Sequence, residues 1–213
     1  MHFYTDWYIF TQMSKKSKSD RTKEFIIEQV APVFNKKGYV GTALSDIEKV
    51  TSLTKGAIYG NFGNKNKLAE ACYEHNIRPL QRGVHNAIST TGGALAQLTA
   101  LLNFYRTHFD QLADNGGCPL LNTAIEVDDT SPLMKDKVQR SILNWKNELC
   151  AVIRKGQLDD EIRSVVKADK FSTTIIAMIE GGIMLAKAMD DKIYFLDVMD
   201  SIEFKINNEL KIK

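Results

Sequence analysis

The stretch TALSDIEKVTSLTKGAIYGNF, residues 42–62, decides the fold expected for the N-terminal part of the chain. It contains two short runs in which apolar residues recur at helical spacing, and residues 51–53 break the pattern between them. Thr42 and Thr54 stand where a helix N-cap is expected, because a threonine oxygen accepts hydrogen bonds from free backbone N–H groups. Two short helices joined by a tight turn are the layout of a helix-turn-helix unit, whose second helix enters the major groove of DNA.

The second helix of this unit, expected to begin after Thr54, is poor in apolar bulk. Gly56 and Ala57 keep its outer face small enough for close approach to base edges. Ile58 and Phe62 are expected to point inward and anchor the helix. The polar side chains that can bond phosphates or bases are Thr54, Lys55, Tyr59 and Asn61.

The distribution of charge also points to a polyanion. Residues 1–85 contain 13 Lys and Arg against 8 Asp and Glu, a net charge of +5, whereas residues 86–213 contain 15 against 18, a net charge of −3. Lys65 and Lys67 fall in the expected first turn of the next helix, where the helix dipole disfavours cations. A phosphate bound at that helix start would offset the penalty, so both lysines are predicted to contact DNA.

The flanking helices are predicted from the same periodicity. Residues 21–37 carry one apolar face, and Gly38 is expected to end that helix. Pro32 falls inside it and is expected to kink it, since proline has no N–H to donate. Gly63 and Asn64 are predicted to end the short helix and to cap a fourth one, which runs into the eighties.

The segment GYVGTALSDIEKVTSLTKGAIYGNFGNKNKL, residues 38–68, resembles the DNA-binding part of the TetR/AcrR-type transcriptional regulators. Their pattern has glycine in the turn where this chain has Ser52, and histidines are common where it has Gly60 and Asn61. The residues that match the pattern are Phe34, Gly38, Tyr39, Thr42, Leu44, Ile47, Thr54, Lys55, Gly56, Ile58, Tyr59, Phe62, Lys65 and Leu68. The resemblance implies that the side chains facing DNA are Thr42, Lys55, Tyr59, Asn61 and Lys65.

The rest of the chain is predicted to be helical, because no run alternates strictly between apolar and polar residues. The whole chain is therefore expected to be all-α, with about nine helices. Its expected divisions are an N-terminal extension at residues 1–19, disordered in part, a helix-turn-helix domain at 20–68, and a helical bundle for effector binding and dimerisation at 69–213.

The helix expected within residues 169–191 is apolar on two faces and must be buried on both sides. The chain's own helices can cover one face, and either a larger bundle or a second copy of the chain can cover the other. The resemblance favours a homodimer, because such regulators pair through their last two long helices. The predicted interface residues are Ile175, Met178, Ile179, Gly182, Ile183, Leu185 and Met189.

The resemblance also implies an effector pocket between the C-terminal helices. The candidates to line it combine apolar walls with polar handles, and they are Tyr105, His108, Cys118, Asn122, Trp145 and Met178. Cys118 raises an alternative, because it lies at an expected helix start, where the dipole can lower the pKa of a thiol and make it a redox or electrophile sensor. A small buried cysteine without reactivity is the other interpretation.

Composition excludes several other classes of protein. The three cysteines are odd in number and have no CxxC spacing, which favours a reducing cytoplasm over a disulfide framework. The histidines lack metal-ligand spacing, so neither a metal nor another cofactor is expected. No apolar run approaches the roughly 18 residues of a membrane span.

The sequence therefore predicts a cytoplasmic, non-enzymatic regulator that binds double-stranded operator DNA as a homodimer. We expect a repressor that a small-molecule effector releases. Two alternatives remain: a thiol-based sensor through Cys118, and a helical carrier or enzyme without DNA binding, for which no nucleophile–base or metal motif is present.

Overall fold

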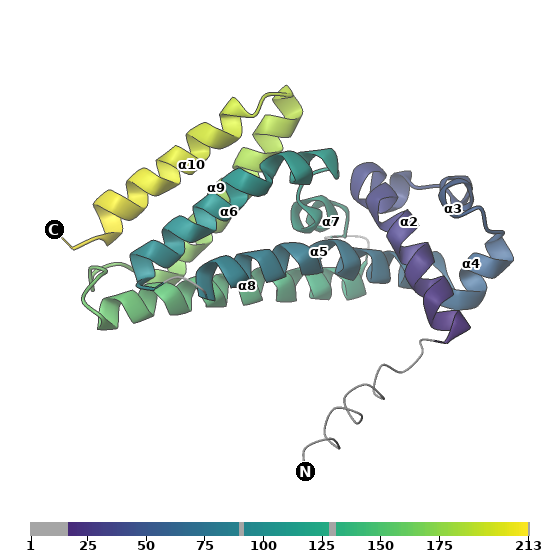
Figure 1. Cartoon of the computed structure of the whole chain (residues 1–213), viewed down its shortest axis with the longest axis horizontal. Helices are drawn as coiled ribbons and strands as arrows, with labels where there is room; N and C mark the ends of the chain where they lie inside the picture. The colour runs from purple at the N-terminus through teal and green to yellow at the C-terminus, as the bar shows by residue number, and fades with distance from the viewer. Residues whose placement is uncertain (1–16, 90–91, 128–130, 213) are drawn as a thin grey trace, which may run out of the picture.

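The computed structural model describes residues 17–89, 92–127 and 131–212, which form nine α-helices, one π turn and no strand. The predicted all-α class is confirmed. A small N-terminal unit lies at one end and a larger bundle at the other, and the long helix α5 runs between them (Figure 1). Residues 1–16 of the extension predicted at residues 1–19 lie outside the described residues. The first described helix begins at Lys18.

The N-terminal unit consists of α2 (Lys18–Gly41), α3 (Leu44–Thr51) and α4 (Lys55–Phe62), packed on the start of α5 (Lys65–Ser89). Ile58 is fully buried and anchors α4 as predicted, whereas Phe62 is half-buried at the edge of the core. The apolar faces of the four helices meet in one cluster, made of Ile26, Val30, Ala31, Phe34, Ile47, Ile58, Leu68, Ala69 and Cys72.

Helix α2 is interrupted at Gly38, where φ is 76° and ψ is 169°. The backbone stays helical through Pro32, so the break lies at the predicted glycine and not at the proline. A positive φ strains any residue that has a Cβ. A Cβ at this position would also collide with the carboxylate of Glu126, which lies in α7 (Pro119–Val127). Glycine at position 38 therefore lets α7 approach the N-terminal unit.

Helix α5 is shared by two cores. Cys72 belongs to the N-terminal cluster, and the next residue, Tyr73, belongs to the cluster that fills the bundle. The helix is continuous through this point and contains Pro79 further along, so a single helix joins the two units. The domain boundary predicted between residues 68 and 69 falls inside this helix. Helix α5 is therefore one physical link between the two cores.

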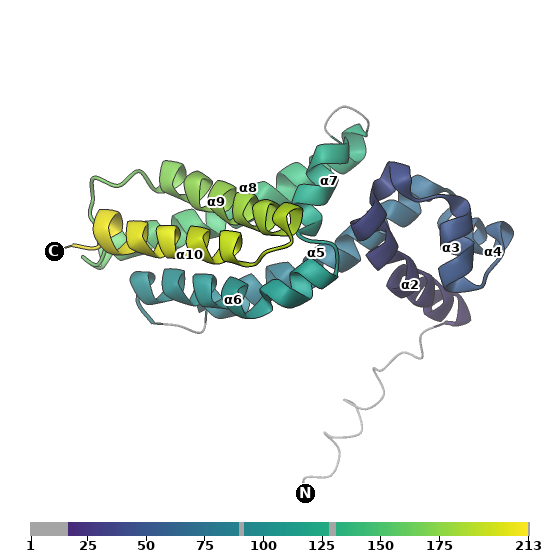
Figure 2. The same cartoon turned by 90° about the horizontal axis from the view of Figure 1, so that it is seen from above.

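The bundle adds α6 (Ala94–Asp114), α8 (Pro132–Leu158), α9 (Ala168–Met189) and α10 (Ile193–Lys205) to α5 and α7, and ends in the π turn Ile206–Leu210. Seen from above, α6, α8, α9 and α10 lie side by side along the bundle, and α7 lies on the side facing α2 (Figure 2). The bundle core is continuous and is built mainly from leucine, isoleucine and phenylalanine.

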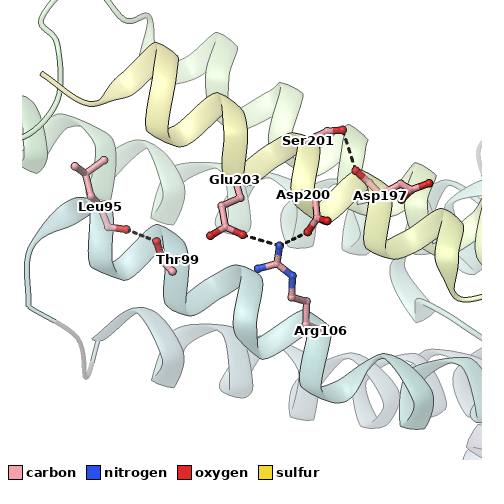
Figure 3. Close-up of polar contacts among 7 residues, drawn as sticks. All are labelled: Leu95, Thr99, Arg106, Asp197, Asp200, Ser201 and Glu203. Carbon is pink, nitrogen blue, oxygen red and sulfur yellow. Dashed lines mark hydrogen bonds and ion pairs between the residues drawn. The ribbon is translucent and has the colours of Figure 1, made fainter. Parts of the chain in front are cut away.

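Arg106 of α6 fixes the position of α10. Its Nη2 atom donates to Asp200 Oδ1 and to Glu203 Oε2, at 2.7 Å in each case (Figure 3). The guanidinium is largely shielded, so these charge-assisted bonds are stronger than a fully exposed ion pair. They hold α10 against α6 and leave the opposite side of α10 facing outward.

Helix α9 is long and apolar enough, by length and composition alone, to cross a membrane, although no such run was expected from the sequence. Among the described residues it is the one helix that meets this test, and 44% of its apolar window is buried inside the bundle. The central helix of a helical bundle has the same properties.

Candidate functional site

The turn between α3 and α4 is held by hydrogen bonds from both sides. Ser52 ends α3 with a φ of 55°, the left-handed conformation that glycine adopts without strain. Thr54 caps α4 as predicted, because its Oγ1 accepts a bond from Ala57 N at 3.4 Å. Glu48 Oε1 accepts a bond from Lys55 N at 2.9 Å. Glu48 thus positions the start of α4 from α3, a role that no sequence pattern indicated.

The outer face of α4 carries two exposed glycines, Gly56 and Gly60, one helical turn apart. A Cβ at Gly56 would have Thr54 Oγ1, at 4.0 Å, as its nearest neighbour, and a Cβ at Gly60 would meet nothing within 4 Å. Glycine inside a helix costs about 0.5–1 kcal/mol relative to alanine. No contact in the described part of the chain accounts for that cost. The two glycines therefore indicate a partner that approaches the α4 backbone closely.

The polar side chains of α4 surround this glycine face. Thr54 and Lys55 are exposed at its N-terminus. Tyr59 is half-buried, and burial raises the pKa of its hydroxyl, so the hydroxyl is a neutral donor near pH 7. Asn61 donates from Nδ2 to the carbonyl of Ala57 at 2.8 Å, which holds its amide along the helix. The arrangement is a small, polar surface with donors at both ends.

Thr42, one of the predicted DNA contacts, is turned into the protein. It is fully buried, and its hydroxyl donates to the carbonyl of Gly38 at 2.6 Å. The predicted contact and the predicted cap at Thr42 are therefore both wrong. Asp46 closes the N-terminus of α3 instead, because its Oδ2 accepts a bond from Ala43 N at 2.9 Å. Thr42 buries its side chain to stabilise the break after Gly38.

The two lysines at the start of α5 differ from each other. Lys65 is half-buried: its Nζ donates to the carbonyl of Tyr39 at 2.6 Å and lies 4.4 Å from the centroid of the Tyr39 ring. Burial lowers the pKa of Lys65. Lys67 is exposed, and its backbone N donates to Asn64 Oδ1 at 3.0 Å, which confirms Asn64 as the cap of this helix. Lys67 is the better placed of the two to reach a phosphate.

A polar junction joins the N-terminal unit to the bundle. Asn35 of α2 donates from Nδ2 to the carbonyls of Asn115 and Gly117, at 2.6 and 3.0 Å. Asn122 of α7 donates back to the carbonyl of Asn35 at 3.1 Å and to that of Gly116 at 2.9 Å. Asn122 therefore belongs to the junction between the two units and not to the cavity that Trp145 lines. At the junction it lines a separate cavity of about 150 Å³.

A larger cavity, of about 330 Å³, lies inside the bundle between α5, α6, α7, α8 and α9. Tyr105 and Trp145, both predicted pocket residues, line it together, and their stacked rings have centroids 5.9 Å apart. Its volume falls in the range of small-molecule sites. Its remaining wall combines apolar residues, such as Ile77 and Leu120, with polar and charged ones, among them Gln81, Arg82, His85, Asn144 and Glu148.

Glu180 of α9 lines this cavity and was not predicted from the sequence. Its Oε1 accepts a hydrogen bond from the Cys118 thiol at 3.1 Å, whereas its Oε2 is buried and has no partner among the described residues. Burial raises the pKa of Glu180 to about 7. An acid in the middle of an apolar helix was the available signal, and the sequence alone could not show that it faces a cavity.

Cys118 is buried, with 1% of its surface exposed, and lies behind Glu180 and not on the cavity wall. Burial, followed by the charge of Glu180, raises the pKa of its thiol well above the ordinary value. The lowered pKa that the thiol-sensor alternative requires is therefore contradicted, because desolvation outweighs the two backbone hydrogen bonds that favour the thiolate.

The other two predicted pocket residues lie elsewhere. His108 is exposed, with its Nδ1 2.8 Å from the carbonyl of Phe104, and it lines a separate cavity of about 440 Å³ that shares Tyr105. Met178 is half-buried and packs against the bundle core, away from the cavity that Trp145 lines. The structure thus brings Tyr105 and Trp145 together and adds Glu180 to them.

The predicted dimer face is partly wrong, because the chain's own helices cover much of it. Ile175, Ile179, Gly182 and Ile183 are buried inside the bundle, and a Cβ at Gly182 would lie 3.1 Å from Val198 Cβ of α10. Leu185 and Met189 are exposed as an interface requires. They belong to an outward apolar surface on α9 and α10, formed by Met184, Leu185, Met189, Ile193, Tyr194 and Phe204. We call this set the α9–α10 face.

Neither unit has the residues of a metal centre. No group of three or more His, Cys, Asp or Glu side chains that could hold a metal ion occurs in residues 17–89, 92–127 and 131–212. The two features that remain for function are the glycine face of α4 and the cavity at Glu180.

Both units match known protein families. Residues 26–72 match the family described as bacterial regulatory proteins, tetR family, and residues 94–202 match the tetracyclin repressor-like C-terminal domain. The crystal structure of a TetR-family transcriptional regulator from Cytophaga hutchinsonii is 38% identical, with a TM-score of 0.84 over 92% of this chain and 98% of that one.

Two further similarities concern relatives with more specific names. The HTH-type transcriptional repressor DhaR of Mycobacterium sp. (strain GP1) is 24% identical over 165 residues, which are 78% of this chain and 82% of that protein. A cysteine-substituted form of the regulator CifR, solved with 26-base-pair double-strand operator DNA, shares the fold at a TM-score of 0.73 and 15% identity, over 87% of this chain and 95% of that one.

Proposed function

The chain belongs to the TetR family of bacterial regulatory proteins and is a DNA-binding transcriptional regulator, and we propose that it acts as a homodimeric repressor that a small molecule releases from its operator. The glycine face of α4 carries the proposal, because its two glycines weaken the helix and no neighbour among the described residues requires a glycine at either position. Such a repressor works on chromosomal DNA, so we place it in the cytoplasm. We assign it no catalytic role.

The major-groove contacts are proposed to come from α4. Gly56, Ala57 and Gly60 give the helix room to approach base edges, and Thr54 and Lys55 reach the backbone phosphates at its N-terminus. Tyr59 and Asn61 supply further donors, and Lys67 adds a phosphate contact from α5. Lys65 is proposed to act indirectly, by holding Tyr39 and the chain break after Gly38 in place.

The second copy of the chain is proposed to pack on the α9–α10 face. Six large apolar side chains of these two neighbouring helices expose between 37% and 66% of their surface, and a second copy of the chain would remove them from water. Arg106 keeps α10 in position, so this surface is fixed before association. A dimer with two-fold symmetry places its two α4 helices on one side of the DNA. The two half-sites of the operator must then lie about one helical turn of DNA apart, or a multiple of it.

Release is proposed to start in the cavity at Glu180. A ligand that displaces Glu180 also moves Cys118, which is hydrogen-bonded to it. Cys118 comes directly after the loop residues 115–117 in the chain, and Asn35 of α2 binds the backbone carbonyls of that loop. Because α2 and α5 carry α4, a small shift at this junction changes the spacing of the two α4 helices in the dimer. A hundredfold loss of operator affinity requires about 2.7 kcal/mol of coupling between the two sites.

The proposal is tested by selecting genomic DNA fragments on the purified full chain and sequencing them. We expect an enriched pseudo-palindrome, and we expect a Tyr59→Ala chain of unchanged oligomeric state to lose that enrichment. A helical carrier or enzyme would enrich no sequence. Enrichment of a motif without two-fold symmetry would contradict the dimeric arrangement.

A further inference from the structure

Two buried polar atoms belong to side chains that line the 330 Å³ cavity and have no hydrogen-bond partner among the described residues. They are Trp145 Nε1, a donor, and Glu180 Oε2, an acceptor when the carboxyl group is ionised. Tyr105 lies beside both: its ring stacks on the indole of Trp145, and burial, followed by the charges of Cys118 and Glu180, raises the pKa of its hydroxyl. The cavity therefore offers a flat aromatic wall with one unused donor and one unused acceptor.

The fold alone does not account for a carboxylate at this position. The Cys118 thiol bonds Oε1 only, and a buried carboxylate oxygen without a partner opposes folding. Glutamine would keep the bond to Cys118 without a charge, and leucine would fill the space. A retained acid with a raised pKa, in a cavity, is the pattern of a functional site.

The charges around the cavity leave Glu180 unbalanced. His85 and Glu148 pair with each other, with Nδ1 and Oε1 2.7 Å apart, and Arg82 is exposed on α5. Among the described residues, no basic side chain contributes to the pKa shift of Glu180. Among the described residues Oε2 therefore has neither a hydrogen-bond donor nor a basic side chain that stabilises its charge, and a ligand cation would supply both.

We propose that this cavity binds a small aromatic amine in its protonated form. The ammonium group donates to Glu180 Oε2, and the aromatic ring lies against Tyr105 and Trp145, where cation–π attraction adds to the ion pair. The claim that this amine is the effector rests on the proposed function, whereas the claim that it binds does not.

Binding requires a small local movement. Oε2 and Nε1 have almost no exposed surface, so the Glu180 carboxylate must turn toward the cavity. Its last torsion is soft, because it joins an sp³ carbon to an sp² carbon. The turn would break or shift the bond to Cys118, which is the contact that leads to the junction at Asn35.

The test uses three probes that share one ring system and differ in charge: naphthylethylamine, naphthylethanol and naphthylacetate. Each is titrated calorimetrically into the full wild-type chain near neutral pH. We expect the amine to bind at least about tenfold more tightly than the alcohol, and the acetate more weakly than both. Equal binding of the three, tighter binding of the acetate, or no binding of the amine overturns the proposal.

The Glu180→Gln variant then assigns the preference to one residue. We expect its affinities for the amine and the alcohol to agree within about threefold, because a neutral amide cannot distinguish the ammonium by charge. Asp114→Asn, which removes an exposed carboxylate of α6, should behave as the wild type. A Glu180→Gln chain that keeps the full preference for the amine also overturns the proposal. If that variant does not fold, the three probes on the wild-type chain still decide.

Failure of this inference and failure of the proposed function are separable, because the calorimetry needs no DNA. A chain that prefers the amine but enriches no operator keeps the inference and loses the proposed function. A chain that enriches a palindrome but binds the three probes alike keeps the proposed function and loses the inference.

Discussion

The thiol of Cys118 donates a hydrogen bond to Glu180 Oε1 across 3.1 Å, which joins the start of α7 to the middle of α9. The preceding carbonyl, that of Gly117, accepts a bond from Asn35 Nδ2 at 3.0 Å. Two hydrogen bonds and the peptide link between Gly117 and Cys118 thus connect the cavity wall, the loop before α7 and helix α2. A ligand that moves Glu180 acts at one end of this path, and α2 is at the other.

We predict that Cys118→Ser retains ligand response and that oxidants leave operator binding unchanged in both proteins. The thiol is buried and its pKa is raised, so little thiolate is present at neutral pH to react. Fluorescence anisotropy of labelled operator, with and without mild peroxide, measures this directly. If peroxide released the wild-type chain but not the serine variant, the thiol would be the sensor.

We predict that Glu180→Gln stabilises the unliganded chain at about pH 8 and has little effect near pH 4.5. The pKa of the Glu180 carboxyl group is about 7 in the fold and about 4.5 when the side chain is exposed, so at pH 4.5 the folded state holds the proton and the unfolded state still holds it about half of the time. As the pH rises from 4.5 to 7, the unfolded state releases the proton first, and the free energy of unfolding falls. The full difference, reached above pH 7, is roughly 3 kcal/mol.

Urea unfolding of both proteins at the two pH values measures this effect. The titratable groups around Glu180 are present in both chains, so they cancel in the comparison: Cys118, Tyr105 and Tyr73 on its near side, and His85 and Glu148 across the cavity. A stabilisation of equal size at both pH values would mean that the carboxyl group is not destabilised by burial.

The helix-turn-helix unit was predictable because its signals are local. Caps at Thr54 and Asn64, the stop at Gly38 and the inward Ile58 each depend on residues within one or two turns, and the structure confirms all four. Thr42 failed because its burial depends on the chain reversing direction after Gly38, which brings a backbone carbonyl to its hydroxyl.

The cavity and the dimer face were harder to predict because they depend on packing between distant helices. Periodicity showed that α9 is apolar on two faces, but only the packing of Val198 against Gly182 shows which face the chain itself covers. Glu180 looked like one acid on an apolar helix until α5, α6 and α8 placed a cavity in front of it. Sequence spacing carries no information on such contacts.

Two neighbouring glycines distinguish the dimer face from the core. We predict that Gly181→Arg gives a folded monomer, since a Cβ at Gly181 would meet nothing within 4 Å and its side chain would project beside the α9–α10 face. Gly182→Arg should not fold, because that position is packed against Val198 and would bury an unpaired charge. Light scattering and circular dichroism separate these outcomes. Leu143→Arg, at an exposed apolar position of α8, should stay dimeric. A dimeric Gly181→Arg chain would place the interface elsewhere.

Gly60→Ala is predicted to raise stability and lower operator affinity. The added methyl group meets nothing within 4 Å inside the chain, and alanine in place of a helical glycine contributes about 0.5–1 kcal/mol. The same methyl group occupies the space that α4 needs to approach base edges. Gly63→Ala is the control: its φ of 81° makes the substitution destabilising. Thermal unfolding measures the change in stability, and operator titration measures the change in affinity. Unchanged operator affinity would remove Gly60 from the interface.

Asn35→Ala is predicted to uncouple the cavity from DNA binding while leaving each separate binding step in place. The substitution removes the bonds from Asn35 Nδ2 to the loop carbonyls of Asn115 and Gly117, so movement at Cys118 no longer pulls on α2. We expect naphthylethylamine to bind the variant with wild-type affinity in the absence of DNA. The variant should also bind the selected operator in the absence of amine.

The measured quantity is the ratio of the operator affinities with and without saturating amine. Linkage requires that the amine affinities with and without saturating operator give the same ratio. Asn103→Ala, an exposed asparagine on α6, should keep the wild-type ratio. If Asn35→Ala kept that ratio as well, the signal would have to pass through another connection, either the bond from Asn122 to the backbone carbonyl of Asn35, which the substitution leaves in place, or helix α5.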